Sequence, residues 1–94
     1  MTSELTTERR QADIEGTIAT AVAAELELAS RDLVELDAAF TDLGLDSTGV
    51  VAVAGEVSDE LGVPVAPETL FDYPTIRQLA HHIAVDSVAV SQHG

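Results

Sequence analysis

Apolar residues recur every four positions in the first third of the chain, which is the spacing of one face of an α-helix. The stripe consists of Ile14, Ile18, Val22 and Leu26. Acidic residues stand between its members and would face water. The pattern predicts an amphipathic helix over residues 10–28. The polar residues before it, 1–7, are expected to be loose.

No helical or strand period is present in residues 29–45. Apolar residues are scattered there among acidic ones, at Leu33, Leu36, Phe40, Leu43 and Leu45. We predict a long ordered loop that these side chains pin to the core, with at most one short turn of helix. A connection of this length in a small domain is often functional.

The segment from Ser47 to Leu61 admits two interpretations. GVVAVA is rich in β-branched residues, which are typical of a buried strand. However, helical spacing relates the apolar residues Val50, Val53, Ala54, Val57 and Leu61. Because polar residues do not alternate with apolar ones, as they would in a half-buried strand, a helix is favoured.

The last third of the chain predicts one short and one longer helix. Gly62, Pro64 and Pro67 interrupt the preceding helix, and PETLFDYP has room for a short one. Thr75 is a suitable cap for a last helix, which runs to about Ala84 and weakens over 86–94. The chain therefore predicts an all-α fold, a small four-helix bundle of three main helices and one short helix.

This pattern also predicts the domain organisation and the core. One domain of residues 9–85 would carry flexible ends, 1–8 and 86–94. Its core would be aliphatic, because aromatic residues make up only 3% of the chain. Phe40 and Phe71 are expected to contribute to it, and for Tyr73 both a packed and a surface position are open.

Charge and composition exclude several classes of function. The chain has 17 acidic residues and four basic ones, a formal net charge of −13. This field repels nucleic acids and anionic membranes and attracts basic protein surfaces. There is no cysteine, no secretion signal and no run near the roughly 18 apolar residues that span a bilayer. We expect a cytoplasmic monomer.

Hydrolytic and metal chemistry find little support in the residues. A nucleophile elbow reads G-x-S-x-G, whereas residues 44–49 read GLDSTG. His81 and His82 are adjacent, so on a helix they point about 100° apart, and His93 is close to the end of the chain. We therefore expect neither a catalytic residue nor a metal site.

Ser47 stands where the long loop becomes a helix, and two roles are open for it. Asp or Ser before an apolar helix is a common N-cap. Alternatively, the unpaired N–H groups and positive dipole end of a helix N-terminus suit a phosphodiester on that serine. Position alone favours the cap.

Two motifs resemble the acyl carrier proteins, most closely those of polyketide synthases. They are LGLDS at 43–47, with Phe40 seven residues before the serine, and FDYPTIRQLA at 71–80. The likeness covers residues 12–84. It implies that a separate phosphopantetheinyl transferase attaches 4′-phosphopantetheine from coenzyme A to Ser47, with Asp46 flanking it as part of the motif and as the helix cap. The arm would carry acyl groups as thioesters, and the chain itself would catalyse nothing.

The resemblance also implies a recognition surface around the serine. Its members would be Asp42, Leu45, Thr48, Val51, Ala52 and Glu56. Ketosynthase, acyltransferase and other synthase enzymes would dock there through basic or apolar surfaces. Two positions depart from the family: Thr48 replaces the usual leucine, and Ala52 replaces a common glutamate. We hypothesise that partners make small apolar contacts here and that charge serves mainly for steering.

Three alternatives to a polyketide-type acyl carrier are open. A peptidyl carrier of nonribosomal synthesis also has the serine and a P-T-I-x-x-L-A segment, but usually reads G-G-D-S where this chain has Leu45. A fatty-acid carrier of primary metabolism fits FDYPT less well. An unmodified acidic module of the same fold would use Asp46 and Ser47 only as a cap.

Overall fold

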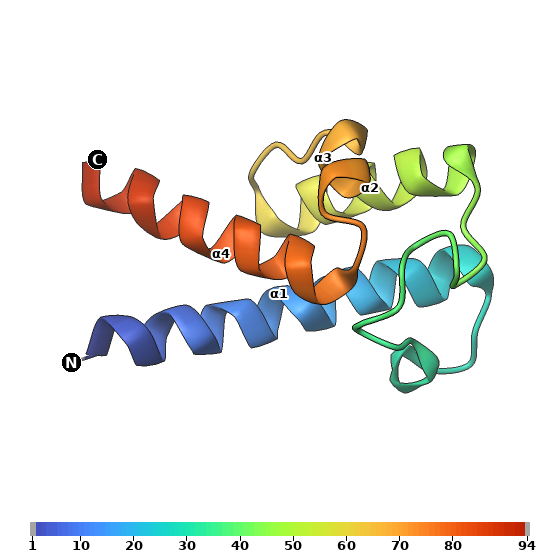
Figure 1. Cartoon of the computed structure of the whole chain (residues 1–94), viewed down its shortest axis with the longest axis horizontal. Helices are drawn as coiled ribbons and strands as arrows, with labels where there is room; N and C mark the ends of the chain where they lie inside the picture. The colour runs from blue at the N-terminus through green and yellow to red at the C-terminus, as the bar shows by residue number, and fades with distance from the viewer. Residues whose placement is uncertain (1, 94) are drawn as a thin grey trace.

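The computed structural model describes the backbone of residues 2–93 and the side chains of residues 9–85. Its elements, in chain order, are α1 (Thr2–Leu26), the 3-10 turn η1 (Arg31–Leu33), α2 (Ser47–Leu61), α3 (Pro67–Asp72) and α4 (Ile76–His93). The prediction of three main helices, one short helix and a long loop between the first two is confirmed. α1 packs against both α2 and α4, and α3 packs against α2. In Figure 1 the end of α1, the long loop and the start of α2 lie together, opposite the first turn of α1 and the last turn of α4.

The bounds of the outer helices differ from the prediction. α1 begins at Thr2 rather than near residue 10, and α4 continues to His93. The apolar period on which the prediction relied is weak in both extensions. In the extension of α1, residues such as Glu, Leu and Arg favour a helix without it, whereas the extension of α4 has no comparable signal in its sequence. The division into a domain of 9–85 with flexible ends stays a prediction, since the side chains of 1–8 and 86–94 lie outside the described residues.

The end of α1 is set by its backbone and not by a glycine. Glu27 adopts a left-handed conformation with φ of 58°. Leu28 N–H donates to the Ala23 carbonyl at 2.8 Å, and Glu27 N–H donates to the Ala24 carbonyl at 3.2 Å. These two bonds form a Schellman motif, which usually has glycine at the left-handed position. α1 therefore stops two residues before the predicted end.

The core is formed by the apolar stripes that the sequence predicted. Ile14, Ile18 and Val22 of α1 are buried, as are four residues of the α2 stripe: Val50, Val53, Ala54 and Val57. Ile76, Leu79, Ala80, Ile83 and Ala84 complete the core from α4. Leu26 and Leu61, at the helix ends, are only partly buried.

Two residues expected in the core lie at the surface. Phe71 is 58% exposed because its neighbour Leu70 occupies the inward position of α3. Leu33 is 62% exposed because Val34, the next residue, anchors the loop in its place. Tyr73 is half-buried and stacks on the His82 ring, with 4.3 Å between the ring centroids.

The long loop is held to the start of α4 by backbone hydrogen bonds. Phe40 N–H donates to the Pro74 carbonyl at 2.8 Å, and Arg77 N–H donates to the Leu36 carbonyl at 3.0 Å. The Arg77 side chain adds an ion pair with Asp37, whose hydrogen bond raises the pKa of the guanidinium further. Much of the FDYPTIR segment therefore serves to position the loop.

Side-chain hydroxyls fix the two ends of the α2–α4 connection. Thr75 Oγ1 accepts a hydrogen bond from Gln78 N–H at 3.1 Å, which confirms Thr75 as the cap of α4. Ser58 Oγ accepts from Val65 N–H at 2.8 Å and so ties the turn before α3 to α2. Within the described residues, no helix is long and apolar enough to cross a membrane.

The left-handed Glu27 generates a stability prediction. Glu27→Gly should raise the free energy of unfolding by about 1 kcal/mol, because glycine adopts this conformation without a Cβ penalty. Urea denaturation followed by circular dichroism measures it. Glu56→Gly, at an exposed position inside α2, is the matched control and should lower the free energy of unfolding by about 1 kcal/mol. A loss of stability in Glu27→Gly similar to that of the control would contradict the assignment.

Candidate functional site

The first turn of α2 is capped by Asp46 and not by Ser47. Asp46 has extended backbone angles, and its Oδ1 accepts a hydrogen bond from Gly49 N–H at 2.8 Å. Ser47 is the first residue of the helix and is exposed. The capping role that position alone favoured for Ser47 thus belongs to its neighbour. The serine hydroxyl stands at the surface, beside the positive end of the helix dipole.

Gly49 allows the loop to fold closely over this first turn. A Cβ at this buried position would lie 3.0 Å from Leu45 Cδ2 and 3.3 Å from Asp46 Oδ1. Gly55, on the same helix, is exposed, and within the described residues a Cβ there would meet no atom within 4 Å. Gly49 is therefore matched to the packing of the loop, whereas nothing in the surroundings of Gly55 calls for glycine.

The LGLDS segment is positioned by a tight turn that closes on the backbone carbonyl of Phe40. The Phe40 carbonyl accepts hydrogen bonds from the N–H groups of Leu43 and Leu45, each at 3.2 Å. Gly44 takes a φ of 109°, a conformation that side chains disfavour. Leu45 is only 5% exposed. Leu45 therefore packs into the core and holds the loop, as expected of it as a loop anchor, and its burial contradicts its prediction as a recognition residue.

The other predicted recognition residues divide between two faces of α2. Val51 lies one turn after Ser47, on the same side of the helix, and is 54% exposed. Thr48 and the loop residue Asp42 are exposed, and Ala52 is half-buried. Thr48 and Val51 thus stand beside the serine, whereas Ala52 lies about 140° around the helix from it, one turn before Glu56.

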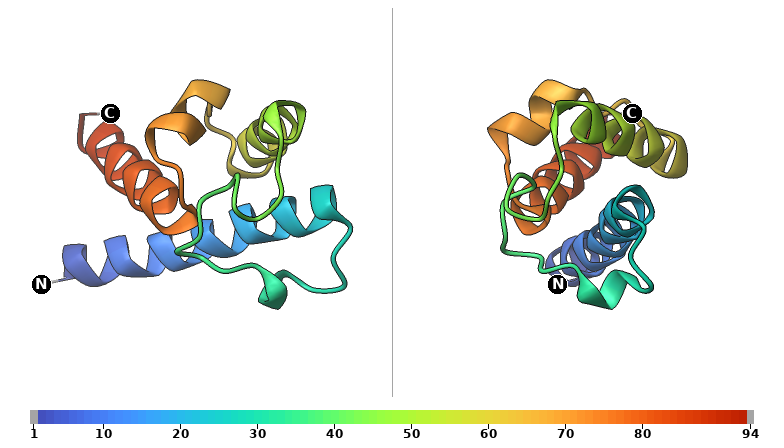
Figure 2. Two further views of the ribbon diagram at one scale, coloured as in Figure 1. Left: turned by 45° about the vertical axis from the view of Figure 1, so that its right-hand side comes forward. Right: turned by 90° about the vertical axis from the view of Figure 1, so that its right-hand side faces the viewer.

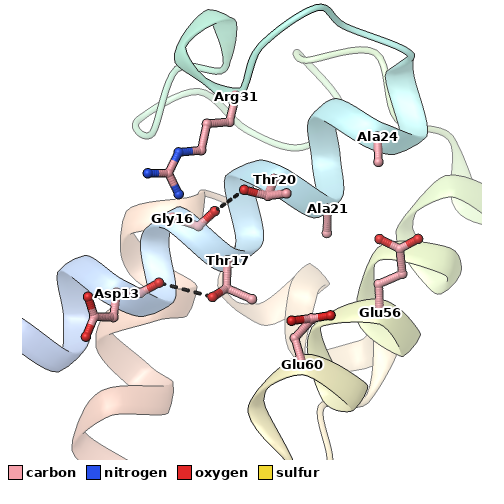
Figure 3. Close-up of a pocket in the computed structure, with 9 residues that line it drawn as sticks. All are labelled: Asp13, Gly16, Thr17, Thr20, Ala21, Ala24, Arg31, Glu56 and Glu60. Atoms are coloured by element: carbon pink, nitrogen blue, oxygen red, sulfur yellow. Dashed lines mark hydrogen bonds between the residues drawn. The ribbon is translucent and has the colours of Figure 1, made fainter.

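Glu56 lies on the opposite side of α2 from the serine. Glu56 comes nine residues after Ser47, which is about two and a half turns of a helix with 3.6 residues per turn. The two side chains therefore point in opposite directions. Figure 3 shows Glu56 and Glu60 facing α1 across a pocket of about 270 Å³, with Thr17, Thr20 and Arg31 among its other residues. The structure thus separates Glu56 from the surface that surrounds Ser47.

One surface residue near α2 was missed by the sequence interpretation. Phe71 is exposed on α3, which packs against α2 (Figure 2). Its position in FDYP, next to Leu70, carried the signal: two adjacent large apolar residues on a short helix cannot both point inward. Phe71 is a candidate contact for a partner that approaches α2 and α3 together.

His81 and His82 each contact a residue outside α4. His81 Nδ1 lies 3.1 Å from Gln11 Oε1 of α1, and His82 stacks on Tyr73. His93 lies outside the residues with described side chains. Among the described residues, no group of three or more His, Asp or Glu is arranged to hold a metal ion.

Comparison with known proteins assigns most of the chain to a family. Residues 16–83 match the family model described as "phosphopantetheine attachment site". The chain is 40% identical over 50 residues to polyketide synthase PksM of Bacillus subtilis, and 39% identical over 62 residues to erythronolide synthase EryA3 of Saccharopolyspora erythraea. These matches cover 53% and 66% of the chain, but only 1% and 2% of those long synthases.

Solved structures of carrier proteins have the same fold. A free-standing peptidyl carrier protein from Acinetobacter baumannii is 33% identical, with a TM-score of 0.74 over 81% of this chain and 94% of its own. The HMG-ACPI domain of the CurA module from Lyngbya majuscula is 26% identical, with a TM-score of 0.75 over 89% of this chain and 82% of its own.

The cap geometry separates the roles of two adjacent residues. Asp46→Ala should lower the free energy of unfolding by about 1 kcal/mol, since it removes the acceptor for Gly49 N–H. Ser47→Ala should change it by less than about 0.5 kcal/mol, because the serine is exposed and does not cap. Chemical denaturation of both variants measures this, with Asp46→Asn as a control that keeps an acceptor. An equal loss in Ser47→Ala would mean that the serine caps the helix.

Proposed function

The chain belongs to the family of phosphopantetheine attachment domains, and from this premise we propose that it is an acyl carrier protein of polyketide biosynthesis with its arm on Ser47. The choice of Ser47 rests on the different roles of two adjacent residues at the start of α2. Asp46 caps the helix, which leaves an exposed serine on the first turn. An exposed hydroxyl is what a separate transferase needs to reach.

The surroundings of Ser47 suit a phosphodiester. The first N–H groups of α2 and the positive end of its dipole stabilise a negative phosphate. When bound, the arm supplies a thiol on which acyl groups are held as thioesters, a group that this chain lacks because it has no cysteine. Carrier domains of this family are in general not catalysts, and we extend this to the present chain.

The polyketide assignment is supported by the sequence relatives and by Leu45 in GLDS. Several polyketide synthases match the region around the serine at 33–41% identity. The similarity to a peptidyl carrier protein, at 33% identity, favours a second candidate, a carrier of nonribosomal peptide synthesis. The two differ in cargo and in partner enzymes and share the chemistry at the serine.

A carrier domain of this family works with synthase enzymes. We propose that a phosphopantetheinyl transferase, a ketosynthase and an acyltransferase dock on the exposed side of α2 through Thr48, Val51 and Ala52, with Phe71 of α3 at the edge. Asp42 and the remaining negative charge would steer basic partners toward this surface. We further propose that the protein is a cytoplasmic monomer.

Loading tests the attachment site. The chain is incubated with coenzyme A, Mg²⁺ and a broad-specificity phosphopantetheinyl transferase, and its intact mass is measured. The parent protein should gain one phosphopantetheine and Ser47→Ala none. Ser30→Ala, which removes another exposed serine, is the control and should load like the parent. No gain on the folded parent would instead support an unmodified interaction module.

Ala52 tests how partners contact α2. Ala52→Glu should lower the kcat/KM for acyl transfer from its own acyltransferase about tenfold, because a carboxylate would lose water in an apolar contact. Ala12→Glu adds the same charge at an exposed position of α1 and should leave the rate nearly unchanged. Faster transfer in Ala52→Glu would show that partners recognise charge at this position and would refute the apolar contact.

A further inference from the structure

An open apolar groove lies beside the loop that leads to Ser47. It has a volume of about 700 Å³ and is formed by Leu26 and Leu28 at the end of α1 and by Leu33, Ala38 and Leu43 of the loop. Leu33 and Leu28 are 62% and 38% exposed. Single exposed leucines are common on protein surfaces, whereas several that converge on one groove indicate a binding site.

The fold itself does not account for these exposed leucines. The loop is anchored by the buried side chains of Val34, Phe40 and Leu45, and by the backbone bonds of Leu36 and Phe40 to the start of α4. Leu33 contributes little to this packing. A polar residue at position 33 would therefore preserve the loop, and the apolar character of the groove calls for another explanation.

The groove is close to Ser47 along the chain and in space. Leu43 precedes the serine by four residues, which can span at most about 14 Å. Gly44, between them, packs on Leu26, with 3.6 Å from its Cβ position to Leu26 Cδ2. Figures 1 and 2 show the end of α1, the loop and the start of α2 at the same end of the molecule.

We propose that this groove holds the apolar acyl chain that is carried on the arm of Ser47. The inference rests on the proposed carrier function and adds a location for the cargo. The chain lies along the surface between α1 and the loop, and it does not enter the Val- and Ala-rich core between the helices.

The covalent attachment of the acyl chain, through the arm on Ser47, favours the acyl chain over a protein as the occupant of the groove. A ligand on a short flexible linker is present at an effective concentration in the millimolar range, so even a shallow groove with millimolar affinity is filled about half of the time. A stable protein interface involves about 20–30 residues on each side. Seven residues line this groove, which suits a tethered chain.

The acidic residues of the groove select among acyl chains. Glu35 and Asp42 complete its lining, and none of its seven residues is basic. A chain that ends in a carboxylate, such as malonyl, is repelled by these two side chains and would also lose water on an apolar surface. A saturated, uncharged chain such as octanoyl avoids both costs.

The test follows the leucine methyl groups in the full-length protein. The chain is labelled with ¹³C at Leu and Val methyls and loaded enzymatically with phosphopantetheine, octanoyl-phosphopantetheine or malonyl-phosphopantetheine, with loading confirmed by mass. Octanoyl should shift the methyl signals of Leu28, Leu33 and Leu43 relative to the unacylated arm, whereas malonyl should not. Leu33→Gln should abolish most of these shifts and speed hydrolysis of the octanoyl thioester about twofold, and Val85→Gln, exposed on α4, should do neither.

Each other outcome overturns the proposal in a recognisable way. Shifts at Val53, Val57 and Leu79 would place the chain in the core, and shifts nowhere would leave it in solvent. Groove shifts that grow with protein concentration would identify a second copy as the occupant. A protein that fails to load at all refutes the carrier function, and with it the groove, whereas successful loading without groove shifts refutes the groove alone.

Discussion

The position of the candidate site depends on one backbone hydrogen bond and the aromatic ring beside it. Phe40 N–H donates to the Pro74 carbonyl, two residues before α4 begins, and its ring is buried in the core. The Phe40 carbonyl then accepts from Leu43 and Leu45 and so closes the turn at Gly44. Leu45 in turn is buried, which places Asp46 at the end of the helix that it caps. A chain of local constraints thus connects the start of α4 to the exposed hydroxyl of Ser47.

This arrangement holds the backbone on both sides of Ser47 in place. Under the proposed function, a separate transferase activates the serine, so this chain supplies no base. The elements around Ser47 are fixed by buried side chains and hydrogen bonds, while the serine itself is exposed. A hydrolase would require the opposite, a nucleophile bonded to a base and shielded from water. The geometry therefore agrees with a role as substrate of another enzyme, which is what the family match indicates.

The sequence was sufficient to predict the helices that have an apolar stripe. It was insufficient where two adjacent apolar residues could each occupy the same buried position. Spacing identified the buried faces of α1, α2 and α4 because each stripe has several members. At Leu33 and Val34, and at Leu70 and Phe71, either residue of a pair could have been the buried one, and only the tertiary path of the chain decides. Leu45 was predicted both as an anchor of the loop and as a recognition residue, and its burial agrees only with the first prediction. The end of α1 was missed because Glu27 occupies a position where a glycine would have been the signal.

The acidic residues of α2 are confined to its second half, which leaves an uncharged stretch of helix after Ser47. Glu56 and Glu60 face α1, on the far side from Ser47, and the segment between Ser47 and Gly55 contains no charged residue. Electrostatic attraction acts over about 8–10 Å at physiological ionic strength, so charges around the edge of the surface steer a basic partner without lying inside the contact. Desolvation of carboxylates would thereby be avoided where Thr48 and Val51 are covered. Under the proposed function, net charge would govern the rate of encounter with partners, and the small uncharged side chains beside Ser47 would govern the fit.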